Sequence, residues 1–254
     1  MSIHRAAAEG FSRDAGLYAR GRPEYPPQAD VWLHETLGLG PGRAVLEVGA
    51  GTGKFTARLA ATGAEVSAVE PVAAMRAACA AALPGVAVRE GVAEALPWPD
   101  ASFDAVVCAQ AFHWFATPRA LAEFRRVLKP GGRLGLIWNV RDERVDWVAA
   151  LTHLIAPYEG DAPRATTGAW RTVFPAEGFG PLREAVFPHV HAGSPEDVIV
   201  ARVMSVSFIA ALPDDTRGDV AEAVRALIAR YPALRGRATV TFPYLTSAYW
   251  CERA

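Results

Sequence analysis

The sequence lacks the features that mark several classes of protein. It has only three cysteines in 254 residues. Because Cys79, Cys108 and Cys251 lie far apart among apolar residues, we expect reduced, buried thiols, no disulfide framework and no CxxC metal pair. No apolar segment approaches the roughly 18 residues of a membrane-spanning helix, and the first sixteen residues contain no apolar signal core. We therefore expect a soluble, cytoplasmic protein.

Neither sign of charge is in excess. Lys and Arg total 26 against 27 acidic residues, which gives a net charge of −1. A protein that binds nucleic-acid phosphates usually carries a basic excess or a basic stripe, so its absence argues against a nucleic-acid partner. Apolar residues make up 51% of the chain. This is typical of a globular protein that is long enough to bury a substantial core in one large domain.

The sequence does contain a regular alternation of short apolar runs and helical patterns. Buried strands are predicted over residues 44–48, 65–69, 87–90, 104–109 and 133–138. Helices are predicted over residues 53–61, from Pro71 onwards and over 117–128. Later in the chain we expect helices near 146–157, 195–211 and 216–231, and strands over 181–190 and 239–250. Strands that alternate with helices imply a parallel sheet covered on both faces.

These elements predict an α/β fold. We expect a Rossmann-like, doubly wound, mostly parallel seven-stranded sheet with an antiparallel terminal strand and a helical lid. Residues 1–34 are polar and aromatic, with a Pro-rich hinge at 22–27, and are expected to form an N-terminal arm or lid. Residues 35–254 are expected to form the main domain, in which residues 145–240 contribute helical insertions on the substrate side.

A glycine-rich segment lies where the first predicted strand meets the first predicted helix. It reads Glu47-Val48-Gly49-Ala50-Gly51-Thr52-Gly53, and glycines there let the backbone turn sharply and approach a ligand closely. The dinucleotide fingerprint GxGxxG would need a glycine at position 54, where the chain has Lys54. The carboxylate of Glu47 disfavours a pyrophosphate and suits a ligand with a positive amino or sulfonium group. The alternative is a glycine-rich turn that binds nothing.

The segment EVGAGTG resembles motif I of the class I S-adenosylmethionine-dependent methyltransferases, and three more motifs of that family follow in order within residues 44–140. Glu70 ends the second predicted strand, and the resemblance implies that its carboxylate accepts both ribose hydroxyls of the cofactor. Residues 91–104 look like the loop on the adenine side. Residues 129–132, Lys-Pro-Gly-Gly, look like the tight turn before the fifth strand.

The adenine-side loop departs from the family at one position. Many members have an Asp after the glycine, whereas this chain has Val92, so we expect backbone groups around Ala93 and Glu94 to hold the adenine. The resemblance implies S-adenosyl-L-methionine as the cofactor. The implied cofactor-binding residues are Tyr18, Arg22, Glu47, Gly49, Gly51, Gly53, Glu70, Pro71, Ala93, Glu94 and Gln110.

An aromatic segment, Ala109-Gln110-Ala111-Phe112-His113-Trp114-Phe115, follows the fourth predicted strand. It resembles the small-molecule branch of the family that includes the trans-aconitate methyltransferases. By that resemblance His113 faces the transferred methyl and acts as a general base or orients the nucleophile. The alternative is a core histidine satisfied by a hydrogen bond. Enzymes that methylate exocyclic amines of nucleic-acid bases carry an Asn/Asp-Pro-Pro-aromatic run here, and this chain does not.

Two further segments carry candidate site residues. Residues 18–26 resemble the N-terminal lead-in of the same branch, which implies that Tyr18 and Arg22 fold over the cofactor, with Arg22 near its carboxylate. The alternative is a polar surface arm. Asn139 and Arg141 are expected in a loop after the fifth strand, facing the substrate or capping a helix. No metal is expected, because the pair His189 and His191 supplies only two nitrogens.

These observations predict methyl transfer from S-adenosylmethionine to an O, N or C nucleophile of a small-molecule acceptor, by in-line displacement. Two alternatives remain open at this point. One is an NAD(P)-dependent oxidoreductase on a Rossmann fold, which NADH binding would reveal. The other is a non-catalytic partner protein that binds S-adenosylmethionine, which would never release S-adenosylhomocysteine with any acceptor.

Overall fold

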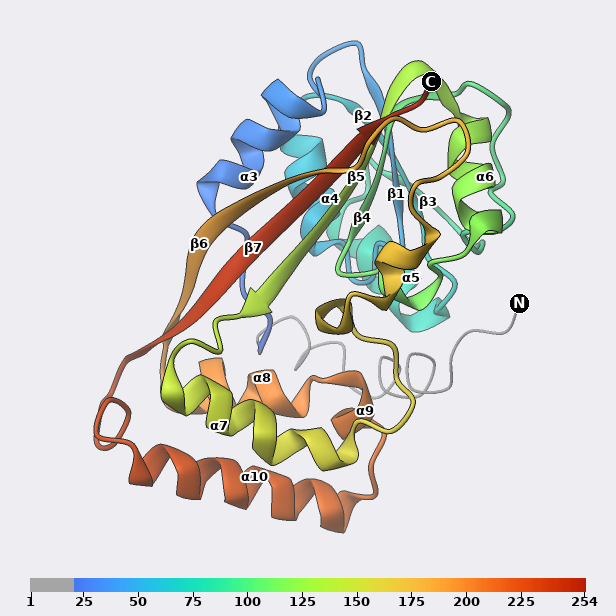
Figure 1. The fold of residues 1–254 in the computed structure, drawn as a ribbon. Helices are drawn as coiled ribbons and strands as arrows, with labels where there is room; N and C mark the ends of the chain where they lie inside the picture. Colours follow the sequence, from blue (N-terminus) through green and yellow to red (C-terminus); the bar gives the residue numbers. More distant parts are fainter. Residues whose placement is uncertain (1–20) are drawn as a thin grey trace.

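Seven strands form one mixed sheet in the computed structural model, which describes residues 21–254 (Figure 1). The strands are β1 (Ala44–Val48), β2 (Glu65–Val69), β3 (Ala87–Arg89), β4 (Phe103–Ala109), β5 (Leu128–Arg141), β6 (Arg183–Gly193) and β7 (Val240–Glu252). Their order across the sheet is β3-β2-β1-β4-β5-β7-β6. Strands β1 to β5 pair in parallel, and β7 is antiparallel to both β5 and β6. The predicted doubly wound sheet with an antiparallel terminal strand is confirmed.

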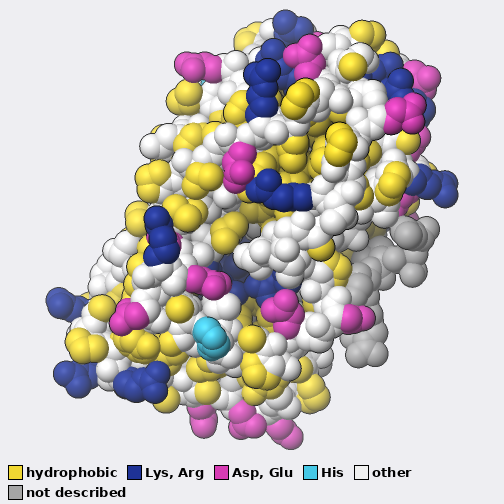
Figure 2. All heavy atoms as spheres, viewed as in Figure 1, with side chains coloured by type: hydrophobic (Ala, Val, Ile, Leu, Met, Phe, Trp, Pro, Cys, Tyr) yellow, Lys and Arg dark blue, Asp and Glu magenta, His cyan; other side chains and the backbone are white. Residues whose placement is uncertain are grey.

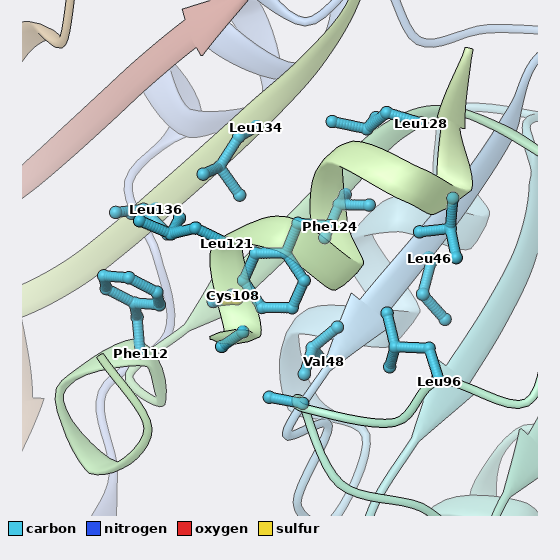
Figure 3. Close-up of a cluster of buried hydrophobic side chains, with 14 of the residues drawn as sticks. Leu46, Val48, Leu96, Cys108, Phe112, Leu121, Phe124, Leu128, Leu134 and Leu136 are labelled. Carbon is cyan, nitrogen blue, oxygen red and sulfur yellow. The ribbon is translucent and has the colours of Figure 1, made fainter. Parts of the chain in front are cut away.

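Helices cover both faces of the sheet because its central strands are apolar on both sides. In β1, Leu46 points into a cluster with Phe124 of α6 (Pro118–Val127), while Val45 points the other way, into a cluster with Phe55 of α4 (Lys54–Ala61). Figure 3 shows side chains of β1, β4 and β5 converging on Leu121 and Phe124 of α6. The three cysteines are buried and free, as predicted.

Hydrogen bonds to nearby side chains set where α5 and α6 begin. The hydroxyl of Thr117 accepts a hydrogen bond from the Ala120 N–H at 3.1 Å and caps α6, with Pro118 in its first turn. The prediction that Pro71 opens a helix is wrong, because α5 (Ala73–Ala82) begins two residues later. The N–H of Val72 donates to the Glu70 carboxylate at 2.9 Å, which holds Val72 in an extended conformation before the helix.

A second layer of helices lies beyond the carboxyl ends of the parallel strands (Figure 1). It contains α7 (Asp146–Ile155), α8 (Ala201–Met204), α9 (Ser207–Ala210) and α10 (Asp214–Arg230). Their apolar side chains form a core of their own against Phe242 and Tyr244 of β7. The single helix predicted over 195–211 is instead a π-helical turn (Glu196–Val200) followed by α8 and α9, because Val206 adopts an extended conformation between them.

Residues 27–36, which precede β1, are helical. Helix α3 (Pro27–Val31) continues as a π-helical turn (Trp32–Thr36), so one helical stretch crosses residue 34 and buries Trp32 and Leu33 against the sheet. The turn predicted at residues 129–132 lies within β5. There the pairing of β5 with β4 is irregular, because the pairing shifts register between Phe103 and Ala105 of β4. Short 3₁₀ turns span Phe112–Trp114, Ala156–Tyr158, Ala165–Thr167 and Ala169–Val173. No helix within residues 21–254 has both the length and the apolar character to cross a bilayer.

Candidate active site

The site lies where the chain reverses its direction of winding across the sheet. From β1 the chain continues to β2 and β3 on one side and to β4 and β5 on the other, which leaves a crevice at the carboxyl ends of β1 and β4. Two cavities open there. We call the cavity walled by Gly49, Glu70 and Ala93 the first cavity, and the one walled by His113 and Arg141 the second cavity.

The glycine-rich loop after β1 forms one wall of the first cavity. Gly49, Gly51 and Gly53 all have positive φ, of 77°, 58° and 88°. A Cβ on Gly49 would lie 2.7 Å from the Cβ of Ala111, so a side chain has no room there. The loop therefore takes a left-handed path, which glycine adopts readily and other residues rarely do.

We expect Gly49→Ala to lose affinity for S-adenosylhomocysteine at least tenfold, because strain of about 1–3 kcal/mol and the contact with Ala111 both displace the loop. Gly42→Ala is the matched control. Gly42 has a φ of 80°, and a Cβ at this position would have no atom within 4 Å. The Gly42→Ala variant therefore has the backbone strain but no steric contact. The measurements are calorimetric binding and thermal unfolding. Equal affinities of the two variants would contradict this role of Gly49.

Glu70 connects the glycine-rich loop to the end of β2. One carboxylate oxygen accepts from the Gly51 N–H at 2.8 Å and the other from the Val72 N–H at 2.9 Å. Burial raises the pKa of Glu70, and these backbone bonds oppose that rise. Because each carboxylate oxygen accepts about two hydrogen bonds, each retains capacity for a donor from the first cavity.

Glu47 is the most deeply buried acid of the first cavity, with 1% of its surface exposed. Its carboxylate accepts from the Thr56 hydroxyl at 2.5 Å. Burial raises the pKa of Glu47 to about 8, with a smaller contribution from the charge of Glu70. The site therefore holds an acid that a cationic ligand group would convert to its carboxylate.

Apolar side chains also line the first cavity. They belong to Pro71, Val72 and Met75, and residues 91–94 line it as well. Ala93 and Glu94 are both buried, and Val92 contributes no carboxylate. A flat heterocycle fits this composition, with backbone groups as its polar partners.

Gln110 stands at the junction of the two cavities. It follows β4 with a φ of 58°, unusual for a residue with a side chain, and its N–H donates to the Ile137 carbonyl at 2.8 Å. Strained backbone of this kind clusters at functional sites. The side chains that line both cavities belong to Arg22, Gln110, Trp114, Asn139 and Arg202.

His113 lines the second cavity. Its Nδ1 accepts from the Trp138 indole N–H at 3.1 Å, so the proton of the neutral ring lies on Nε2. Burial lowers the pKa of His113 to about 3, and the nearby charges of Arg164 and Arg22 lower it further. The ring is therefore a neutral hydrogen-bond donor at physiological pH, with its acceptor nitrogen already occupied.

Known proteins share this fold and sequence. The methyltransferase domain family matches residues 46–136. The chain is 40% identical to an uncharacterized methyltransferase of Mycobacterium bovis, over 96% of this chain and 94% of the relative. It is 36% identical to an uncharacterized methyltransferase-like protein of Schizosaccharomyces pombe, over 96% and 95%. The chain belongs to the S-adenosylmethionine-dependent methyltransferases.

The solved structures agree at the level of the fold. A structure assigned as a type II methyltransferase from Anaeromyxobacter dehalogenans is 25% identical, with a TM-score of 0.63 over 91% of this chain and 96% of that one. The predicted class I methyltransferase family is therefore confirmed. The narrower trans-aconitate branch stays a prediction.

Most of the predicted site residues line one of the two cavities. The first cavity gathers Arg22, Glu47, Gly49, Gly51, Glu70, Pro71, Ala93, Glu94 and Gln110. Gly53 instead precedes α4, where a Cβ would lie 2.9 Å from the Cys79 sulfur. Tyr18 lies outside the described residues. Within residues 21–254 no group of three or more His, Cys, Asp or Glu side chains could hold a metal ion.

The predicted loop around Asn139 and Arg141 is wrong, because both residues belong to β5, which pairs with β7 through Arg141. Asn139 is buried, and its amide donates to the Glu24 carbonyl at 2.9 Å and accepts from the Thr246 hydroxyl at 2.6 Å. Asn139 therefore links residue 24 to the sheet. The prediction failed because pairing with β7 extends β5 beyond the apolar run that was used to predict it.

Sequence reasoning missed Arg164 and Arg202, which line the second cavity. Arg164 lies in an irregular segment without periodicity, and no pattern indicates it. Arg202 had a detectable signal, because it is the one charge within the apolar run of residues 198–204. Burying a charge in such a run is costly unless the charge is paired, so Arg202 could have been singled out as a candidate.

Proposed function

We propose that the first cavity binds S-adenosylmethionine and that the second cavity holds a small-molecule acceptor. The supporting observation is the shared wall. Gln110, Trp114 and Arg202 line both cavities, so the two cavities adjoin at these residues. In-line displacement needs the methyl group and the nucleophile on opposite sides of one short gap.

The residues of the first cavity fit this cofactor part by part. The Glu70 carboxylate has capacity left for the two ribose hydroxyls, and the apolar wall near Met75 suits the adenine. Glu47 provides a buried anion for the α-ammonium group, and Arg22 lines the same cavity as a partner for the carboxylate. A nicotinamide dinucleotide would instead bring two phosphates towards Glu47, and neither form of that acid supplies the positive charge that phosphates favour.

The cofactor, when bound, supplies a methyl group on a sulfonium centre, and the neutral thioether is a good leaving group. The protein then needs chiefly to position the acceptor and exclude water, and such positioning is worth on the order of 7–11 kcal/mol. An O, N or C nucleophile of the acceptor would form the new bond as the C–S bond breaks with its electrons left on sulfur, and any proton on the nucleophile would pass to solvent. We propose that His113 orients the acceptor through its Nε2–H, since its Nδ1 is occupied and its pKa is low.

His113→Phe tests that protonation state without knowledge of the acceptor. Between pH 6.5 and 3 the unfolded histidine binds a proton that the folded one does not, so stability falls as pH falls. We expect the unfolding free energy of the wild type to drop by about 1 kcal/mol more per pH unit than that of the variant between pH 6 and 4. Urea unfolding measures both. Parallel curves would contradict a neutral His113.

The proposed function itself is tested by turnover. The protein is incubated with S-adenosylmethionine and a panel of small-molecule acceptors, and released S-adenosylhomocysteine is quantified. We expect release with at least one acceptor, and none when that acceptor is omitted. Binding without release from any acceptor would favour a non-catalytic binding protein, and binding of NADH in place of S-adenosylmethionine would favour the oxidoreductase.

A further inference from the structure

The second cavity has an excess of positive charge in its wall. Four arginines line it, Arg22, Arg141 of β5, Arg164 and Arg202 of α8, and none of the described residues in its wall is Asp or Glu. Figure 2 shows Lys and Arg side chains recessed in a hollow of the face it presents. Burying a charge costs several kcal/mol unless it is paired, so this arrangement favours a ligand that supplies the missing charge.

Arg202 carries the strongest part of this argument. Only 9% of the residue is exposed, and its Nε and Nη1 are buried without any hydrogen-bond partner among the described residues. Buried guanidinium N–H groups are normally satisfied. Because Arg202 lines both cavities, its unsatisfied donors lie at the place where the acceptor would meet the cofactor.

Arg141 is a second buried arginine in this wall. It is 9% exposed, and burial lowers its pKa to about 9, with further lowering by the charges of Arg202 and Arg164. It remains a cation at neutral pH and is repelled by its neighbours. Arg164 is different, because its Nη1 pairs with Glu159 at 2.7 Å and its guanidinium lies over the Phe208 ring.

His113 adds a neutral donor to the same wall. Its Nε2 carries the proton because Nδ1 accepts from Trp138. Arg22 donates to the Ser205 carbonyl at 2.8 Å. Arg141 and Arg202 therefore offer two guanidinium forks beside an imidazole N–H, and no carboxylate in the wall competes for them. Carboxylates and phosphates are the groups that planar guanidinium forks recognise in a bidentate way.

We propose that Arg141 and Arg202 bind an anionic group of the acceptor, a carboxylate or a phosphate, with the His113 Nε2–H as a third donor. The inference rests on the proposed function in one respect, because it takes the second cavity to be the acceptor site. It specifies the acceptor as an acid, and it assigns these arginines to specificity.

Calorimetry with two simple probes tests this inference. Succinate and inorganic phosphate are each titrated into protein saturated with S-adenosylhomocysteine, and we expect one of them to bind with a Kd on the order of 1 mM. Arg141→Met should weaken that binding at least tenfold, because it removes one of the two forks. Its affinity for S-adenosylhomocysteine should stay within about twofold, since Arg141 lines the second cavity and not the first.

Arg225→Met is the matched control. Arg225 is exposed on α10 and pairs with Glu196, so its replacement should leave both affinities unchanged. Thermal unfolding supplies a second readout. Removing a buried, uncompensated charge should not lower Tm, whereas removing a structural arginine would. A lower Tm of R141M together with unchanged anion binding would overturn the inference.

The outcomes separate the two proposals. If succinate binds more tightly, the acceptor carries a carboxylate, and if phosphate binds more tightly, it carries a phosphate. If S-adenosylhomocysteine binds but neither anion does, or if R141M binds them as well as the wild type, this inference is wrong and the proposed function stands. If S-adenosylhomocysteine itself does not bind, the proposed function is wrong.

Discussion

Glu70→Ala should lower the affinity for S-adenosylhomocysteine by about 100-fold or more. Two ribose hydroxyls would lose a charged acceptor, and a hydrogen bond to a charged group is worth about 1.5–3 kcal/mol. The variant also leaves the Gly51 N–H without its acceptor, so the loop that contacts the cofactor loses its link to β2. Both losses act in the same direction. Isothermal titration calorimetry measures the change directly.

A neighbouring carboxylate provides the control for this variant. Glu90 follows β3, close to the same edge of the sheet, but its side chain is exposed and pairs with Arg76 at 2.9 Å. Glu90→Ala should bind S-adenosylhomocysteine as tightly as the wild type. Circular dichroism establishes that both variants fold. A folded Glu70→Ala variant that binds like Glu90→Ala would remove Glu70 from the cofactor site.

The affinity for S-adenosylhomocysteine should rise by about 50-fold between pH 6 and pH 8. With its pKa raised to about 8, Glu47 is mostly protonated in the free protein at pH 6, whereas the ammonium group of the ligand favours the carboxylate. Binding at low pH must therefore release a proton, and that cost disappears as the pH approaches 8. The measurement is calorimetry over this range, in buffers of different ionisation enthalpy.

Glu47→Gln is the control for that pH dependence, because it keeps the shape and cannot titrate. Its affinity should change little over the same range. In the free protein the shift has the opposite consequence. Folded Glu47 keeps a proton that the unfolded chain releases above pH 4.5, so stability falls as pH rises from 4.5 towards 8. A wild-type affinity independent of pH would contradict a cationic ligand group beside Glu47.

The sheet and the first cavity could be predicted from the sequence because local patterns carry them. The apolar runs that become β1, β2 and β4 match the structure to within one residue, since a strand buried on both faces is a nearly continuous run of apolar residues. The GxGxG spacing likewise follows from backbone geometry. All three glycines have positive φ, and a Cβ on Gly49 or Gly53 would lie within 3.0 Å of a neighbouring side chain.

The second cavity could not be predicted in the same way because it forms from residues distant in sequence. Arg141 lies on β5, Arg164 in an irregular segment and Arg202 on α8, and only the packing of the helical layer brings them together. No period or spacing relates them. The tautomer of His113 was equally hidden, because it depends on Trp138, which follows it by 25 residues and lies on β5.

A crystal structure with S-adenosylhomocysteine tests the central claim most directly. It should show the ribose hydroxyls on Glu70, the adenine beside residues 91–94, and the sulfur at the wall formed by Gln110, Trp114 and Arg202, pointing into the second cavity. A ligand found elsewhere on the protein, or one in the first cavity whose sulfur points away from the second, would contradict the account.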